Sequence, residues 1–230
     1  ETCRYVNINP DNIPLDDFYT YSQIRQGETF GIFQYEGWGY TKFIKKMQPR
    51  NFNDLIALGA LYRPGTIASG MADEYVDTMH RDLSDLKATA HSPHLDGITD
   101  DTYGIYLYQE QVMYATVKYA GFTMNEADTL RKAIGKKDAE LMKSVLCVLA
   151  DKMAEKGQNP EFIIDLVGKI EKFARYGWNK AHAVSYAILS YQTAYLKFSY
   201  PTAFFCALLN SELDDNERVQ RIIAEACLYK

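Results

Sequence analysis

A short basic corner at residues 177–182 offers the clearest set of side chains for binding an anion. It reads Gly-Trp-Asn-Lys-Ala-His and precedes a pattern in which apolar residues recur every three or four positions, typical of a helix. Asn179 is a good N-cap, so Lys180 and His182 are expected in the first helical turn. Cations are unfavourable at this end of the helix dipole, but the unpaired backbone N–H groups attract anions. The corner therefore predicts an anion site. The alternative is a solvated lysine and a histidine bonded to a backbone carbonyl.

A second basic cluster lies at the end of a predicted helix. It places four cations within seven residues: Arg131, Lys132, Lys136 and Lys137. Positive charge near a helix C-terminus is favourable in itself. The same side chains would also suit contacts with phosphate or with a DNA backbone. Both interpretations stay open from the sequence.

One further cation, Arg63, is held in a rigid turn because it follows Tyr62 and precedes Pro64-Gly65. A guanidinium fixed in this way could bind phosphate through two parallel hydrogen bonds. It could equally cap a neighbouring helix. The sequence does not decide between these two roles.

No set of residues has the spacing of a self-contained active site. Phosphoryl transfer with two metal ions needs carboxylates that converge on Mg²⁺. The acidic pairs at 16–17, 100–101 and 214–215 instead fall where helix caps or loop ends are expected. The P-loop, GxSxG and HExxH motifs are absent from the sequence. His91, His94 and Asp96 fit no closed metal site well, so we expect a solvated loop there.

The composition is that of an ordinary globular protein. The chain has 230 residues, of which 47% are hydrophobic and 24% are charged. Its four cysteines are far apart in sequence, which favours reduced thiols in the cytoplasm over a metal site or disulfides. No apolar run reaches the roughly 20 residues of a membrane span, so no membrane partner is expected. The net charge of −5 does not itself indicate nucleic-acid binding, although a local basic patch can still bind.

Helical patterns dominate the elements that would position these side chains. We predict helices over 18–25, 36–47, 70–80, 109–119, 123–134, 138–156, 159–174, 201–209 and up to 229, with others after Asn51 or Asn53 and after Asn179. Thr123-x-x-Glu126 is a capping box, and Gly135 is expected just past the end of its helix. Segment 29–33 could be a strand or a buried turn, segment 103–108 could be a short strand, and 81–102 is expected to be a loop. The fold class predicted is mainly α, with at most one or two short strands.

Eight blocks of sequence, in order, carry a family resemblance. They include GIFQYE, FNDLIALGALYRPG, TYGIYLYQEQVM, EADTLRKAIGKK and ARYGWNKAHAVSYA, and they lie at 13–17, 31–36, 52–65, 69–75, 102–113, 126–137, 170–197 and 200–219. Together they resemble the fingers region of the bacterial replicative DNA polymerase III alpha subunit, a C-family polymerase. The resemblance implies a multi-helix fingers domain over 1–230, with a possible subdivision into 1–100 and 101–230.

The resemblance also implies a function in DNA replication. A fingers domain of this family binds the triphosphate of the incoming dNTP and contacts the template DNA during template-directed synthesis. The family's nucleotide- and template-contacting positions match these residues: Arg63, Gln109, Arg131, Lys132, Lys136, Lys137, Tyr176, Asn179, Lys180 and His182. The implied partners are primed template DNA, dNTP, and the palm and thumb domains of the same polymerase.

Catalysis is expected to lie outside this chain. In the family, the catalytic aspartates and their Mg²⁺ ions belong to the palm domain. We therefore expect no catalytic residue, metal ligand or bound cofactor here, and no polymerase activity from the isolated chain. The sequence begins with Glu rather than Met, so we expect an excised domain or a split subunit.

Several positions depart from the family pattern. Thr66, Trp178 and Ala181 stand where Pro, Phe and Ser are usual, and a run of the QLESxGM type is QYEGWGY here. The loop 81–97 lacks the usual basic run. Two other hypotheses stay open: a helical module that binds DNA or a polymerase as a regulator or decoy without a catalytic role, and a helical scaffold without a nucleic-acid role.

Overall fold

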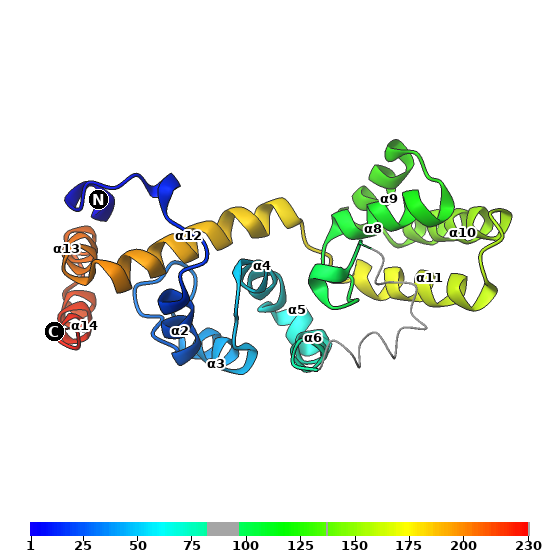
Figure 1. Ribbon diagram of the computed structural model, residues 1–230. Coiled ribbons are helices and arrows are strands. Elements are labelled where there is room, and N and C mark those ends of the chain that lie inside the picture. Colours follow the sequence, from blue (N-terminus) through cyan, green and yellow to red (C-terminus); the bar gives the residue numbers. More distant parts are fainter. Residues whose placement is uncertain (82–96, 137, 230) are drawn as a thin grey trace. The chain divides into compact units, whose positions relative to one another are not determined.

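The computed structural model describes residues 1–81, 97–136 and 138–229, and these residues fold into helices (Figure 1). Outside the helices, the described residues contain one isolated β-bridge, between Tyr108 and Trp178, and no strand. The prediction of a mainly α fold is therefore confirmed. Lys137, His91, His94 and Asp96 lie outside the described residues.

The chain forms two compact units. The terminal unit consists of Glu1–Gly59 and Val184–Lys230, and the middle unit consists of Ala60–Ala183. One unit is thus built from the two ends of the sequence and the other from a continuous segment. The expectation of one domain over 1–230, with a possible boundary at residue 100, stays a prediction because compactness alone does not define a domain.

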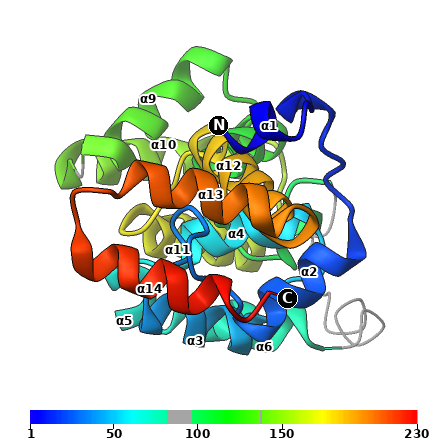
Figure 2. The same ribbon diagram turned by 90° about the vertical axis from the view of Figure 1, so that its left-hand side faces the viewer.

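The terminal unit is organised around the long helix α12. Its elements are α1 (Thr2–Tyr5), η1 (Pro10–Asn12), α2 (Phe18–Gln26), α3 (Trp38–Met47), most of α4 (Phe52–Leu61) and of α12 (Lys180–Ser199), α13 (Pro201–Ser211) and α14 (Asn216–Ala226). Figure 2 shows α13 and α14 lying side by side. Tyr191 of α12 packs its ring 5.2 Å from that of Tyr21 in α2, and its hydroxyl accepts a hydrogen bond from Asp17 N at 2.9 Å.

A buried lysine attaches α14 to α12. The side chain of Lys197 is completely buried, and its ammonium donates to Glu225 Oε1 at 3.0 Å and to the Glu28 carbonyl at 3.2 Å. Burial lowers the pKa of Lys197, while hydrogen bonding to the Glu225 carboxylate opposes that shift. A buried charge is tolerated only when it is paired in this way. Lys197 therefore stabilises the position of α14 as long as Glu225 is present.

The middle unit is a cluster of helices around an apolar core. Its elements are α5 (Pro64–Ala68), α6 (Met71–Met79), η2 (Asp100–Thr102), α8 (Gln109–Ala115), the π-helix η3 (Thr116–Ala120), α9 (Met124–Lys136), α10 (Ala139–Glu155) and α11 (Pro160–Ala174). Leu130, Leu149 and Leu166, from α9, α10 and α11 in turn, are fully buried. These three helices therefore share one core, and the basic corner follows directly at the end of α11.

The helix starts agree with the predicted ranges and with the expected role of the acidic pairs 16–17 and 214–215 as caps. Asp17, Asp138, Asn159 and Asp215 each accept a hydrogen bond from a backbone N–H of the first turn. The capping box of α9 is also confirmed, because Glu126 Oε2 accepts from Thr123 N at 2.7 Å and Thr123 Oγ1 accepts from Glu126 N at 3.3 Å. Glu126 additionally pairs with Lys152 Nζ at 2.6 Å.

Some local expectations are wrong. Segment 103–108 is turn and extended chain rather than a strand, because no strand lies beside it in the described residues, whereas segment 29–33 adopts the turn that was its alternative prediction. Gly135 lies inside α9, which ends at Lys136, instead of just after the helix. Beyond the end of α9, Asp138 N donates a hydrogen bond to the Ala133 carbonyl at 3.1 Å. The turn at Pro64 is the start of α5, where a proline is well tolerated.

Candidate nucleotide and nucleic-acid interface

The basic corner connects α11 to α12 within the middle unit, and its tightness depends on Gly177. A Cβ atom at Gly177 would lie 2.6 Å from Phe173 Cζ and 3.2 Å from Ile134 Cγ2, so only glycine fits. Asn179 Oδ1 accepts a hydrogen bond from His182 N at 2.8 Å, which confirms Asn179 as the N-cap of α12. Lys180 and His182 are therefore in the first turn, as predicted.

The start of α12 already holds an anion, and that anion comes from the chain itself. The carboxylate of Glu110 accepts from Lys180 N at 2.9 Å through Oε2 and from Asn179 Nδ2 at 2.7 Å through Oε1. This is the group that the helix dipole and the unpaired N–H groups favour. The corner thus attracts negative charge, and Glu110 of α8 supplies it in this structure.

Lys180 is also paired within the unit. Its ammonium lies 2.6 Å from Asp101 Oδ2 and 5.3 Å from the centre of the Tyr108 ring. Both charged side chains are about one-third exposed, at 35% for Lys180 and 32% for Asp101, so the pair remains in contact with solvent. The alternative of a solvated lysine is therefore not what the structure shows, because Lys180 forms a partly exposed ion pair.

Arg63 caps a neighbouring helix, which is the second of the two roles that the sequence leaves open for it. Its Nε donates to the Ala60 carbonyl at 2.7 Å, in the last turn of α4, and Nη2 donates to the Tyr176 carbonyl at 2.7 Å. Its guanidinium lies 4.2 Å from the centre of the Trp178 ring. Burial lowers the pKa of Arg63. Arg63 therefore links the corner to Ala60 within the middle unit. The Tyr176 ring packs closely on Gly65.

A cavity of about 510 Å³ opens at the corner. Five of the predicted residues line it: Arg63, Gln109, Tyr176, Asn179 and His182. The other lining residues are Ile134, Gly135, Ala174, Arg175, Gly177 and Trp178. None of the described residues that line this pocket carries a carboxylate. The structure therefore brings half of the predicted site together around a pocket with cationic side chains.

The remaining predicted residues on α9 lie apart from the pocket lining. Arg131 Nη2 and Lys132 Nζ both contact the carboxylate of Asp128, at 2.7 and 2.8 Å. The hydrogen bonds from Lys132 and Arg131 lower the pKa of Asp128. Lys136 is exposed at the end of the helix. Lys132 and Lys136 are exposed and Arg131 is half-buried, so these cations lie on the surface of α9, and both interpretations of the cluster stay open.

Sequence comparisons identify the family. A model described as the bacterial DNA polymerase III alpha subunit finger domain matches residues 1–157, more than half of the chain. This chain belongs to that family.

Named relatives extend the match beyond the family model. The DNA polymerase III subunit alpha of Aquifex aeolicus is 42% identical over 97% of this chain and 19% of its own length. The corresponding proteins of Escherichia coli K12 and Haemophilus influenzae are each 40% identical, over 93% and 94% of this chain. The chain spans about a fifth of the length of these relatives. It is thus similar to one part of a much larger polymerase subunit.

Sequence reasoning missed three charged residues of this fingers domain. Asp101 and Glu110 contact the corner from 79 and 70 positions away in sequence, so local patterns could not pair them with Lys180. Arg175 stands inside the conspicuous run ARYGWNKAH, but the resemblance did not assign it a contact. It is exposed and lines the 510 Å³ pocket.

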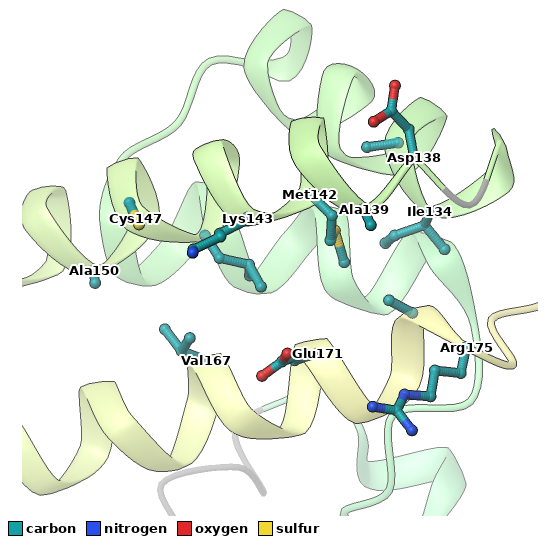
Figure 3. Close-up of a pocket in the computed structure, with 13 residues that line it drawn as sticks. Ile134, Asp138, Ala139, Met142, Lys143, Cys147, Ala150, Val167, Glu171 and Arg175 are labelled. Atoms are coloured by element: carbon teal, nitrogen blue, oxygen red, sulfur yellow. The ribbon is translucent and has the colours of Figure 1, made fainter.

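Arg175 also borders a second pocket of the fingers domain. This pocket, of about 810 Å³, lies between α10 and α11, and Figure 3 shows Met142 and Lys143 on one side and Val167, Glu171 and Arg175 on the other. It shares Ile134, Ala174 and Arg175 with the corner pocket. Arg175 therefore places a guanidinium on the wall common to both.

The described residues contain no group of three or more side chains suited to a metal ion. Among the same residues, no helix is long and apolar enough to cross a membrane.

Proposed function

We propose that this fingers domain binds the triphosphate of an incoming deoxynucleoside triphosphate and the adjacent template DNA, for template-directed synthesis by a DNA polymerase. The observation that carries the proposal is the corner pocket, which is lined by Arg63, Arg175 and His182 and by no carboxylate of the described chain. In a chain with a net charge of −5, such a pocket concentrates positive potential in one concave place. Triphosphate is the ligand chemistry that this potential favours.

The start of α12 supplies the second half of the proposed site. Glu110 holds Asn179 and the backbone of Lys180 in place, and Asp101 holds the Lys180 ammonium nearby. A triphosphate carries more negative charge than one carboxylate, so it competes with Asp101 for Lys180. In this proposal Asp101 keeps Lys180 extended near the pocket until the nucleotide arrives.

The exposed cations of α9 suit a different ligand. Arg131, Lys132 and Lys136 lie on a helix surface rather than in a pocket, and we propose that they contact the phosphate backbone of the template. Lys137, outside the described residues, stays a prediction. The carboxylates and Mg²⁺ of nucleotidyl transfer are proposed to come from the palm domain of the same polymerase. The thumb domain and primed template DNA complete the expected partners.

Equilibrium dialysis of a dNTP against the 230-residue chain tests the nucleotide site. Arg175→Ala should weaken binding about ten- to a hundredfold, because one charge-assisted contact contributes roughly 1.5–3 kcal/mol. Lys169→Ala is the matched control, since Lys169 pairs with Asp165 at 2.9 Å on α11 and does not line the pocket. Inorganic triphosphate should compete with the dNTP, and the unphosphorylated nucleoside should not.

Two outcomes would contradict the proposal. One is equal competition by the nucleoside, which would remove the role of the phosphates. The other is DNA binding by the chain without any nucleotide affinity, alone or in a reconstituted polymerase. That result would favour the alternative of a helical regulator or decoy module.

A further inference from the structure

The terminal unit exposes a tryptophan beside a row of lysines. Trp38 is the first residue of α3, and 80% of its surface is exposed, although large aromatic side chains are usually well buried. The ammonium of Lys42 lies 5.1 Å from the centre of its indole ring. The ring is therefore held beside a cation with its surface open to solvent.

The charge on α3 has one sign. Lys42, Lys45 and Lys46 are all exposed, and α3 contains no acidic residue between Trp38 and Met47. Residues four apart share a helical face, so Trp38, Lys42 and Lys46 follow one another along it at intervals of about 6 Å. This cationic row is unusual in a chain whose net charge is −5.

Trp38 also borders a polar pocket of about 520 Å³. Two of its acidic lining residues are neutralised, because Glu36 pairs with Arg218 at 2.7 Å and Glu225 pairs with Lys197 at 3.0 Å. The other charged lining residues are Glu28 and Arg221, whose opposite formal charges sum to zero. The lysines of α3 therefore determine the sign of the potential around Trp38.

We propose that this face of α3 binds single-stranded DNA, with one base stacked on Trp38 and the flanking phosphates on Lys42 and Lys46. Proteins that bind single strands combine an aromatic surface for the bases with cations for the backbone, and both are present here. A protein partner is disfavoured, because the centres of protein interfaces are depleted of lysine. The inference deepens the proposed function by naming a second contact for the template strand. It rests on that function only for the choice of DNA as the ligand.

Fluorescence anisotropy of a labelled oligothymidylate, titrated with the 230-residue chain at low salt, tests the site. Trp38→Ala should weaken binding about tenfold, and Trp38→Phe should retain most of it, because any aromatic ring can stack on a base. Lys42→Ala should reduce the dependence of log K on log salt by about 0.7, the value of one phosphate contact on a single strand.

The matched control is Phe18→Ala. Phe18 is 77% exposed and carries the Arg25 guanidinium 5.6 Å from its ring centre, but it follows Asp16 and Asp17. Because no row of net positive charge surrounds Phe18, its ring should not bind DNA. Phe18→Ala should therefore leave the affinity for the oligonucleotide unchanged. Thermal melting of each variant, followed by circular dichroism, establishes that it is folded.

Three results would overturn the inference. They are an unchanged affinity of Trp38→Ala, an equal loss in Phe18→Ala, and equal binding of an abasic oligonucleotide with the same phosphates. Equilibrium dialysis of a dNTP against the Trp38→Ala variant tests whether this site is independent of the corner pocket. The variant should bind nucleotide as the parent chain does, so failure at one site does not imply failure at the other.

Discussion

The Lys180 ammonium pairs with the Asp101 carboxylate, which a nucleotide phosphate would replace in the proposed function. In a reconstituted polymerase, Lys180→Ala should lower kcat/KM for nucleotide about ten- to a hundredfold, because one charge-assisted contact is lost. The free energy of unfolding should fall by less than about 1 kcal/mol, since the pair with Asp101 is partly exposed. Steady-state kinetics and urea denaturation measure the two effects.

Lys169→Ala is the control for Lys180, since it removes a partly exposed ion pair of the same kind from α11. It should leave nucleotide kinetics unchanged. If Lys180→Ala instead lowers stability strongly and leaves kcat/KM unaltered, the corner is structural.

Asn179 both caps α12 and donates a hydrogen bond to Glu110, and a second cap variant can separate its effect on stability from its effect on nucleotide binding. Asn179→Ala removes the cap of α12 and the hydrogen bond to Glu110, so it should destabilise the chain by about 1 kcal/mol and also raise KM for nucleotide. Asn159→Ala removes an equivalent cap from α11 and should cost a similar free energy. Denaturation and kinetics on both variants are the measurement; a rise in KM for both would mean that stability alone is responsible.

At the scale of the element, the connection between α11 and α12 depends on one glycine. Gly177→Ala should destabilise by about 1–3 kcal/mol, because its Cβ would overlap the Phe173 ring. Gly168→Ala, inside α11, should instead stabilise by about 0.5–1 kcal/mol, because a Cβ added there would meet no atom within 4 Å. Urea midpoints with equal m-values measure both, and equal signs for the two variants would contradict the packing argument.

The capping box of α9 predicts a pH dependence. The hydrogen bond from Lys152, followed by those from Thr123, lowers the pKa of Glu126 from the ordinary 4.5 to about 2. A depressed carboxyl pKa stabilises the folded state above the unfolded value, and this stabilisation disappears as the pH falls from about 4.5 towards about 2. Denaturation of the parent chain and of Glu126→Gln should therefore differ most near neutral pH. A difference that persists undiminished at low pH would refute the assignment.

Local elements were predictable because their signals are local. Asp138 and Asn159 each cap the helix that directly follows, and the acidic pairs 16–17 and 214–215 supply the caps Asp17 and Asp215, so residue type and spacing locate each cap to within one residue. The candidate site was predictable only in part. Its partners Asp101 and Glu110 come from distant segments, and tertiary packing alone brings them to Lys180. Gly135 failed as a helix end because α9 continues through it to Lys136.

At the scale of the whole molecule, charge distribution limits DNA binding. Cations gathered on α3, α9 and the corner are opposed by a net charge of −5. The 230-residue chain should therefore bind primed DNA weakly, with Kd about 10⁻⁴ to 10⁻⁶ M at physiological salt, and more weakly as salt rises. A salt series of electrophoretic or anisotropy titrations measures this, and nanomolar binding that persists at high salt would contradict it.

The two tryptophans have an optical consequence. The chain contains only Trp38 and Trp178, and each borders one of the two proposed ligand sites. Trp38 is open to water, whereas Trp178 lies under the Arg63 guanidinium, so their fluorescence should differ in colour and in quenching by iodide. Replacing either one by phenylalanine leaves a single tryptophan, whose emission can be excited selectively over that of the 18 tyrosines. Each tryptophan is therefore an intrinsic fluorophore for one site, so ligand binding at α3 and at the corner can be followed separately without an added label.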